Sequence, residues 1–154
     1  MPIEQLIKSS TQNTKGRNNS TGSYDGILKN LVSFIRKSFK SIPVIISNVE
    51  SKNKSISIRV FPLSQDLVSQ SSSSRLYEYS FEIVLYYTIA NPNEGDYKNY
   101  LNYSDKIENV LFFHRTSEEW FDGVVSNITV NSGDSTNLDV LTTRFSFNCK
   151  HSIN

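Results

Sequence analysis

The chain has 154 residues, of which 37% are hydrophobic, 12% aromatic and 20% charged. These values favour one ordered, β-rich domain over a disordered chain. A single cysteine, Cys149, excludes an intrachain disulfide and indicates an intracellular origin. The N-terminus lacks the apolar core of a signal peptide, and the longest apolar run, IVLYYTIA, is too short to cross a bilayer as a helix. We therefore expect no membrane partner.

The net charge of +1 hides an uneven distribution. Residues 1–60 contain ten basic and three acidic residues, a net charge of +7, whereas residues 61–154 contain six basic and twelve acidic residues, a net charge of −6. Such a division can be an accident of solvated surfaces. It also suits a head-to-tail assembly in which the basic face of one subunit meets the acidic face of the next.

The N-terminal part predicts an arm followed by a helix. Residues 8–23 have no apolar side chain, so we expect a flexible N-terminal arm over residues 1–23 and a single domain over residues 24–154. From Tyr24 onward, apolar residues recur at spacings of three and four up to Phe39, which predicts an amphipathic helix. Its opposite side forms a candidate basic face of Lys29, Arg36, Lys37 and Lys40.

Three strands are predicted next. The run IPVIISN gives a short one, and SISIRVFP gives a second, which we expect Pro62 to end because proline cannot donate to the ladder. Residues 63–74 are too rich in serine for regular structure and predict a long hairpin tip. Residues 75–90, RLYEYSFEIVLYYTIA, alternate with a period of two. Straight, they would span about 50 Å, more than the roughly 40 Å diameter of a compact chain of this length, so we expect the hairpin to protrude.

A protruding hairpin with an exposed apolar row would aggregate unless a partner covers the row, and another copy of the chain is the expected partner. We expect a charge at Tyr79 or Phe81 to impair assembly and leave the monomer folded. The candidate interface residues on the hairpin are Arg75, Tyr77, Glu78, Tyr79, Phe81 and Glu82.

The second half predicts a helix and two strands. Asp96 can cap a helix that runs to about His114. The charged loop RTSEEWFDG follows, with Arg115, Glu118, Trp120 and Phe121 as further candidate interface residues. The Trp–Phe pair in this loop fits either a core anchor or an interface anchor. The run VVSNITV, the turn NSGDSTN and LDVLTTRFSFNC give the last strand pair.

Together these elements predict an α+β fold in the order α-β-β-β-α-β-β. We expect a mostly antiparallel sheet with a long β-hairpin and both helices packed on one face.

The sequence offers little catalytic chemistry. Cys149 and His151 share a strand face, but no second pair stands at metal-ligand spacing. Glu78 and Glu82 would lie roughly 13 Å apart, beyond the span of paired glycosidase carboxylates. No glycine cluster could cradle a phosphate. We therefore expect neither an enzyme nor a cofactor or metal site.

The segments PVIISN, SISIRVFPLSQD, RLYEYSFEIVLYYTIA and TTRFSFNC, placed between and after two helices over residues 24–150, resemble the tail-terminator, or tail-completion, proteins of tailed bacteriophages. The resemblance implies a small α+β subunit that forms a ring, usually a hexamer, at the head-proximal end of the tail tube. Such a ring stops tube growth and presents a surface to the neck. The family has no catalytic signature, so the resemblance assigns no functional residue.

The implied partners are other copies of the chain, the tail tube protein, neck and connector proteins, and a sheath or sheath terminator. DNA would pass through the lumen without sequence-specific binding. The implied location is the tail and neck of the virion, after assembly in the host cytoplasm. Two alternatives stay open: another neck or head-completion ring protein at the head-tail connection, and a DNA-binding module that uses the basic face.

Overall fold

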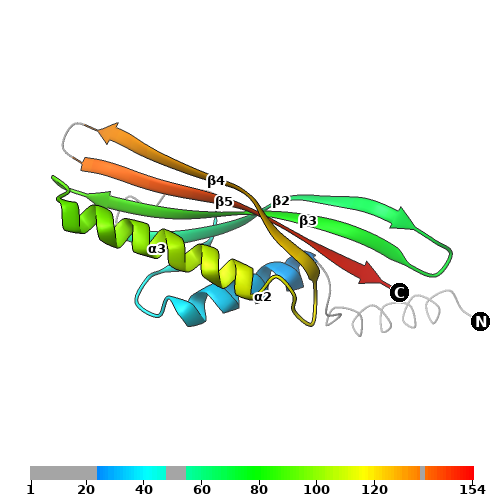
Figure 1. Cartoon of the computed structure of the whole chain (residues 1–154). Helices are drawn as coiled ribbons and strands as arrows, with labels where there is room; N and C mark the ends of the chain where they lie inside the picture. Colours follow the sequence, from blue (N-terminus) through cyan, green and yellow to red (C-terminus); the bar gives the residue numbers. More distant parts are fainter. Residues whose placement is uncertain (1–23, 48–54, 136–137) are drawn as a thin grey trace, which may run out of the picture.

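The computed structural model describes residues 24–47, 55–135 and 138–154. The predicted arm over residues 1–23 lies outside them. The predicted α+β fold and its element order are confirmed (Figure 1). The elements are α2 (Tyr24–Ser38), β1 (Val44–Ile46), β2 (Ile56–Gln70), β3 (Arg75–Ile89), α3 (Glu94–Phe113), β4 (Phe121–Ser135) and β5 (Leu138–Ile153). Within the described residues, neither helix is long and apolar enough to cross a membrane.

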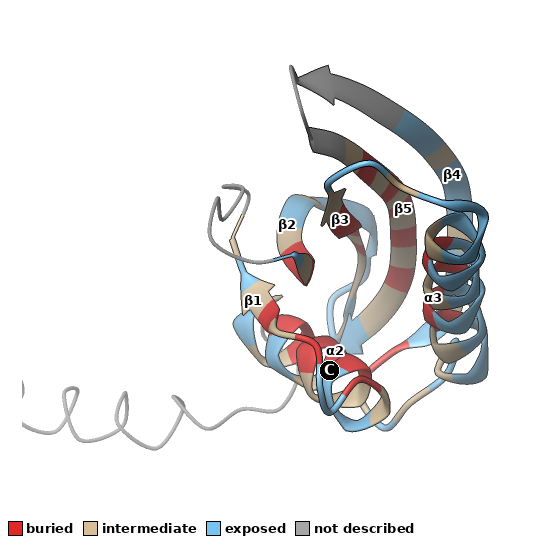
Figure 2. Ribbon diagram, turned by 90° about the vertical axis from the view of Figure 1, so that its left-hand side faces the viewer, coloured by how far each residue is buried: buried red, intermediate tan, exposed pale blue. Residues whose placement is uncertain are grey.

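The strands form one five-stranded sheet in the order β1-β2-β3-β5-β4. Only the β1–β2 pair is parallel. The long strand β3 lies at the centre and pairs with β2 on one side and with β5 on the other along its whole length. Both helices pack on the same face of this strongly curved sheet, as predicted (Figures 1 and 2). We call the other side the helix-free face.

The period of two in β3 decides which side chains enter the core. Its odd positions from Tyr79 to Tyr87 are buried on the helix side, and the odd positions of β5 from Leu141 to Cys149 are buried beside them. Helix α2 buries its apolar stripe against this layer, with Ile27 and Ile35 fully enclosed. Each large apolar side chain buried in this way contributes about 1.5–3 kcal/mol of transfer free energy.

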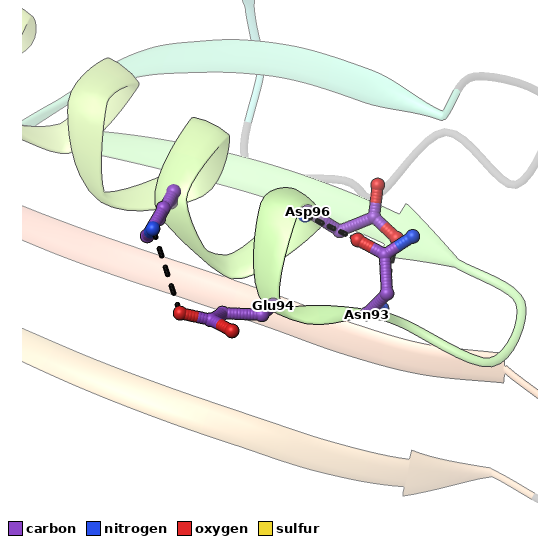
Figure 3. A network of polar contacts seen from close by, with 4 residues as sticks. Asn93, Glu94 and Asp96 are labelled. Carbon is purple, nitrogen blue, oxygen red and sulfur yellow. Dashed lines mark hydrogen bonds and ion pairs between the residues drawn. The ribbon is translucent and has the colours of Figure 1, made fainter.

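Helix α3 begins with a capping box, shown in Figure 3. The side chain of Asn93 accepts a hydrogen bond from the backbone N–H of Asp96 at 2.9 Å, and the Asp96 carboxylate accepts one from the N–H of Asn93 at 3.0 Å. Asn93 is therefore the cap, whereas the sequence analysis gave that role to Asp96. Asp96, at the third helical position, accepts the reciprocal hydrogen bond. Each residue thus provides an acceptor for a backbone N–H that has no partner within the helix.

Strand β2 is longer than predicted because Pro62 does not end it. Ile58 donates its N–H to Pro43, and Val60 accepts from Ser47, so alternate positions of β2 direct their backbone groups away from β3. Pro62 is the next position of that series, and its missing N–H faces the strand edge, where proline is tolerated. A register shift between Pro62 and Ser64 accommodates it, and the ladder continues to Gln70.

The serine-rich tip is also shorter than predicted. Residues 63–70, expected to be irregular, belong to β2, and only four serines make the turn. The Ser71 hydroxyl accepts from the N–H groups of Ser73 and Ser74, and the Ser71 N–H donates to the Ser74 carbonyl at 2.8 Å. Side-chain bonds of this kind let serine close a tight turn. Strand β4 likewise extends into the predicted turn and reaches Ser135, while residues 136–137 lie outside the described residues.

The sheet is longer than the helix layer that covers it. At one end, β2, β3 and the last residues of β5 extend beyond both helices, as Figure 1 shows. The predicted protruding hairpin is therefore present, but as a three-stranded arm, because β5 pairs with β3 as far as Ile153 opposite Arg75. We call the stretch of β2 from Phe61 to Gln70 the arm edge.

Candidate assembly surfaces

The predicted apolar interface row on the arm is largely a core feature. Tyr79 and Phe81 are 1% and 0% exposed. The ring of Tyr24, the first residue of α2, lies 5.0 Å from the Tyr79 ring and 5.3 Å from the Phe81 ring, and its hydroxyl donates to the Ser80 carbonyl at 2.9 Å. The expectation that these two side chains meet a partner is wrong, because this helix already covers them. A charge at either position would act on folding before assembly.

Trp120 is also a core residue and not an interface anchor. It is 2% exposed, its ring lies edge-on to Phe34 and Phe147, and its indole N–H donates to the His114 carbonyl at 2.9 Å. These contacts fix the connection from α3 to β4. Its neighbour Phe121 stays 39% exposed at the start of β4.

The other predicted interface residues remain accessible in different degrees. Arg75 and Glu118 are exposed, while Tyr77 and Glu78 are partly buried on the arm. Glu82 lies on the helix-free face and accepts a hydrogen bond from Arg144 at 2.8 Å. The structure brings Glu78 and the predicted Arg115 together along one groove. Tyr77 and Glu82 point to opposite faces of β3, so the predicted residues do not all share one patch.

The predicted basic face follows the exposed side of α2. Two of its members also serve the chain itself. Lys29 pairs with Asp25 at 2.7 Å, and the Arg36 guanidinium donates twice to the Val44 carbonyl, at 3.2 and 3.0 Å. The Arg36 bonds tie the helix to β1. Lys37 on the last turn of α2 and Lys40 just after it leave this outer surface positively charged.

The arm edge carries exposed apolar side chains within the stretch that was predicted to be an irregular hairpin tip. Leu63, Leu67 and Val68 are between 49% and 52% exposed. Strand β1 pairs only with residues 58–60 of β2, so the arm edge has β3 as its only partner among the described strands. The Tyr24 hydroxyl lies near the backbone of Leu63 and Ser64, and the stretch from Gln65 to Gln70 continues beyond that contact. Exposed backbone and exposed apolar side chains at a strand edge are typical of a surface that meets another chain.

A second apolar surface lies at the opposite edge of the sheet, along α3 and β4. Six large apolar side chains there are 41% to 64% exposed. We call this set the α3–β4 strip: Tyr97, Leu101 and Phe112 on α3, and Val124, Ile128 and Val130 on β4. Ile128 and Val130 point to the helix side, whereas Val124, opposite Asn148, lies where the strip turns onto the helix-free face. Strand β4 pairs only with β5 among the described strands, so its other edge is free as well.

Sequence reasoning missed this strip for a physical reason. The apolar residues of α3 point in more directions than one buried face needs, and that excess was the available signal. Which of these α3 residues stay exposed depends on the position of β4 at the sheet edge. The helical spacing of apolar residues does not predict that position.

A groove runs past the first residues of β4. One part, of about 530 Å³, is lined by Glu78, Arg115, Asp122 and Lys150 among others. The adjoining part, of about 300 Å³, has a more apolar lining that includes Phe112 and Val124. Lys150 and Asp122 pair at 3.4 Å, and the Arg115 guanidinium lies 4.5 Å from the centre of the Phe112 ring. Paired charges beside apolar side chains suit contact with a protein surface.

Arg59 is a buried cation on the helix-free face. It is 3% exposed, and its Nε and Nη2 atoms find no hydrogen-bond acceptor among the described residues. Its guanidinium carbon lies 5.6 Å from the centre of the Tyr86 ring. The attraction between a cation and an aromatic ring offsets part of the cost of taking this charge out of water.

The groups with the most reactive chemistry serve the fold. Burial, and secondarily the charge of Glu78, raises the pKa of Cys149 to about 12, which suppresses the nucleophilic thiolate. The His151 ring contacts the Glu119 carbonyl through Nδ1. His114 stacks on Phe34 with ring centres 3.9 Å apart. The described residues contain no group of three or more His, Cys, Asp or Glu side chains placed to hold a metal ion.

Comparison of the sequence with protein-family models and with curated proteins gives no significant match. Function must therefore be inferred from the surfaces themselves.

Proposed function

We propose that the protein is a structural subunit that forms a homo-oligomeric ring at the head-proximal end of a bacteriophage tail tube. The ring ends tube growth and provides the interface to the neck. The observation that carries this proposal is the three-stranded arm, which projects beyond the helices with apolar side chains exposed along one edge (Figure 1). The resemblance to tail-terminator proteins rests on the order of the elements and on the strand pattern of residues 56–90, which includes the long strand after Arg75.

Assembly is supported by the positions of the two apolar surfaces. The arm edge and the α3–β4 strip lie on opposite edges of the sheet. Two different surfaces on one subunit suit heterologous contacts, which give a closed ring when the rotation between subunits closes. The division of charge between the two parts of the chain adds a second kind of complementarity.

Termination follows if the two ends of the ring differ. In this proposal one end imitates the subunit that the tube expects next, whereas the opposite end meets the neck and accepts no further tube subunit. The helix-free face includes the pair of Glu82 and Arg144 beside neutral polar side chains such as Ser146 and Asn148. If this face lines the lumen, its balanced charge lets DNA pass without sequence-specific binding.

The test uses the purified chain and tail tubes assembled from the tube protein of the same phage. Light scattering after size exclusion gives the mass of the particle, and electron microscopy shows the tube ends. We expect rings at one end of each tube and shorter tubes when the chain is present during polymerisation. A ring that ignores tube ends would transfer the proposal to a neck or head-completion protein. A monomer that neither binds tube ends nor assembles would reject the proposal.

A further inference from the structure

We propose that the ring contact is made by the arm edge of one copy docking on the α3–β4 strip of the next copy. This inference rests on the proposed ring and names the surfaces that build it. The occupant of the strip is thus a second copy of this chain.

One stretch of the β4 edge lacks the usual protection against pairing. From Asn127 to Asn131 the strand has no proline, no charged residue and no register shift, and Ile128 and Val130 are 42% and 58% exposed. Natural proteins protect free edges with such features because an open edge recruits other strands. An unprotected edge beside exposed apolar side chains of α3 is expected to be covered in the assembled protein.

The arm edge of the same copy does not reach this surface. Strands β3 and β5 lie between β2 and β4 in the sheet: β3 pairs with β2 and β5, and β5 pairs with β3 and β4. Figure 1 shows the β2–β3 tip and the β4–β5 hairpin at opposite ends of the molecule. A contact between the two surfaces therefore joins two copies.

The side chains on the two surfaces match. Leu67 lies opposite Tyr77, and Val130 lies opposite Thr143, so both point to the helix side of the sheet. If the arm of a second copy lies along β4, its Leu67 extends the apolar layer that begins at Val130 of the first copy. The same arm then also packs against the exposed apolar residues of the first copy's α3. Asp66 lies opposite Glu78 and points to the helix-free face, where it adds a negative charge to the arm edge. Arg115, which lines the groove beside Val124, offers a positive charge at one end of the strip.

Side-chain packing carries more of this contact than backbone pairing. The arm edge contains Pro62 and two register shifts, between Pro62 and Ser64 and between Leu67 and Ser69. These irregularities leave only a short regular stretch for hydrogen bonding to another strand. They also disfavour pairing between the arm edges of two copies.

Cysteine cross-linking tests the contact. The variants Leu67→Cys and Val130→Cys are purified separately, mixed at high concentration and treated with a bifunctional maleimide. The native Cys149 is buried and its pKa is about 12, so the unmodified chain serves as an unreactive control. We expect the mixture to give a product of twice the 17.5 kDa chain mass, and the doubly substituted chain to give a ladder of products.

The matched control pair is Ser69→Cys with Asn127→Cys. Both residues are exposed neighbours of the tested positions, but they point to the helix-free face. The proposed contact is rejected if the test pair cross-links no more than this control. It is also rejected if either single variant cross-links with itself as well as the mixture does, because that result indicates a symmetric contact.

A charge variant gives an independent measurement. Leu67→Lys should weaken self-association by about tenfold or more, the effect of losing one buried interface side chain, and Ser69→Lys should not. A ring seen by light scattering without the Leu67–Val130 cross-link would keep the proposed function and reject this contact. The cross-link without binding to tube ends would keep the contact and reject the place in the tail.

Discussion

The covered centre of the sheet and its uncovered ends are built from the same strands but differ in what their apolar residues do. Along β2, Ile58 is 0% exposed, whereas Leu67 is 50% exposed. The helix layer makes the difference, because it ends near Tyr24 while the strands continue. Apolar residues at the centre stabilise the monomer, and those at the ends are available for assembly.

The largest effect is expected for Phe81→Ala at the covered centre. This side chain is fully buried and packs against Tyr24, so its truncation should lower the free energy of unfolding by about 3–5 kcal/mol. Leu67→Ala, at the uncovered end of the neighbouring strand, should change it by no more than about 0.5 kcal/mol. Urea denaturation of the two variants measures the difference, and equal losses would contradict the distinction.

Gly123→Ala should have the next largest effect, because it overpacks the connection that holds Trp120. A Cβ atom at Gly123 would lie 2.6 Å from the Arg115 carbonyl oxygen and 2.7 Å from its Cα. These are backbone atoms that cannot swing aside, so we expect a loss of about 1–3 kcal/mol. At Gly95 the nearest atom is the Asn93 Oδ1, at 3.1 Å, and Gly95→Ala should change the melting temperature much less. A reversed order would show that the loop after α3 is not rigidly packed.

Loss of the α3 cap should cost less again. Asn93→Ala removes the acceptor for the Asp96 N–H and should lower the free energy of unfolding by about 1 kcal/mol (Figure 3). Asn93→Ser keeps a capping oxygen and should preserve most of the stability. Thermal melts followed by circular dichroism measure both variants. Equal melting temperatures for Asn93→Ala and Asn93→Ser would mean that the capping oxygen does not stabilise the fold.

The smallest effect concerns pH. Burial, and then the positive charge of Lys37, lowers the pKa of His114 from its ordinary value of 6.5. The unfolded chain therefore binds this proton more readily than the folded one, so stability should fall as the pH drops below about 6.5. His114→Gln should remove this part of the slope. An unchanged slope in denaturation midpoints between pH 7.5 and 5.5 would show that another group is responsible.

The sequence predicted the order of elements and the buried side of β3, since an amphipathic repeat states which face is apolar. It did not predict where each strand ends. The predicted ends were wrong at Pro62 and at the serine tip. Whether a proline ends a strand depends on whether its nitrogen faces a partner strand or the free edge. Whether serines form a tight turn depends on how the two strands beside them pair.

Most residues of the candidate assembly surfaces could not be predicted from local sequence patterns. Tyr79, Phe81 and Trp120 looked available in the sequence, but Tyr24, Phe34 and Phe147 cover them from distant positions. The α3–β4 strip was missed for the complementary reason. Its residues look like core residues, and only the position of β4 at the sheet edge leaves them exposed.

The most direct test of this account is the mass of the native particle beside that of Leu67→Lys, measured by light scattering at matched concentrations. The account predicts a particle of several 17.5 kDa chains for the native protein, and a lower mean mass with an unchanged circular dichroism spectrum for the variant. A variant that assembles as well as the native protein, or that loses its fold together with its assembly, would contradict the assignment of the arm to assembly.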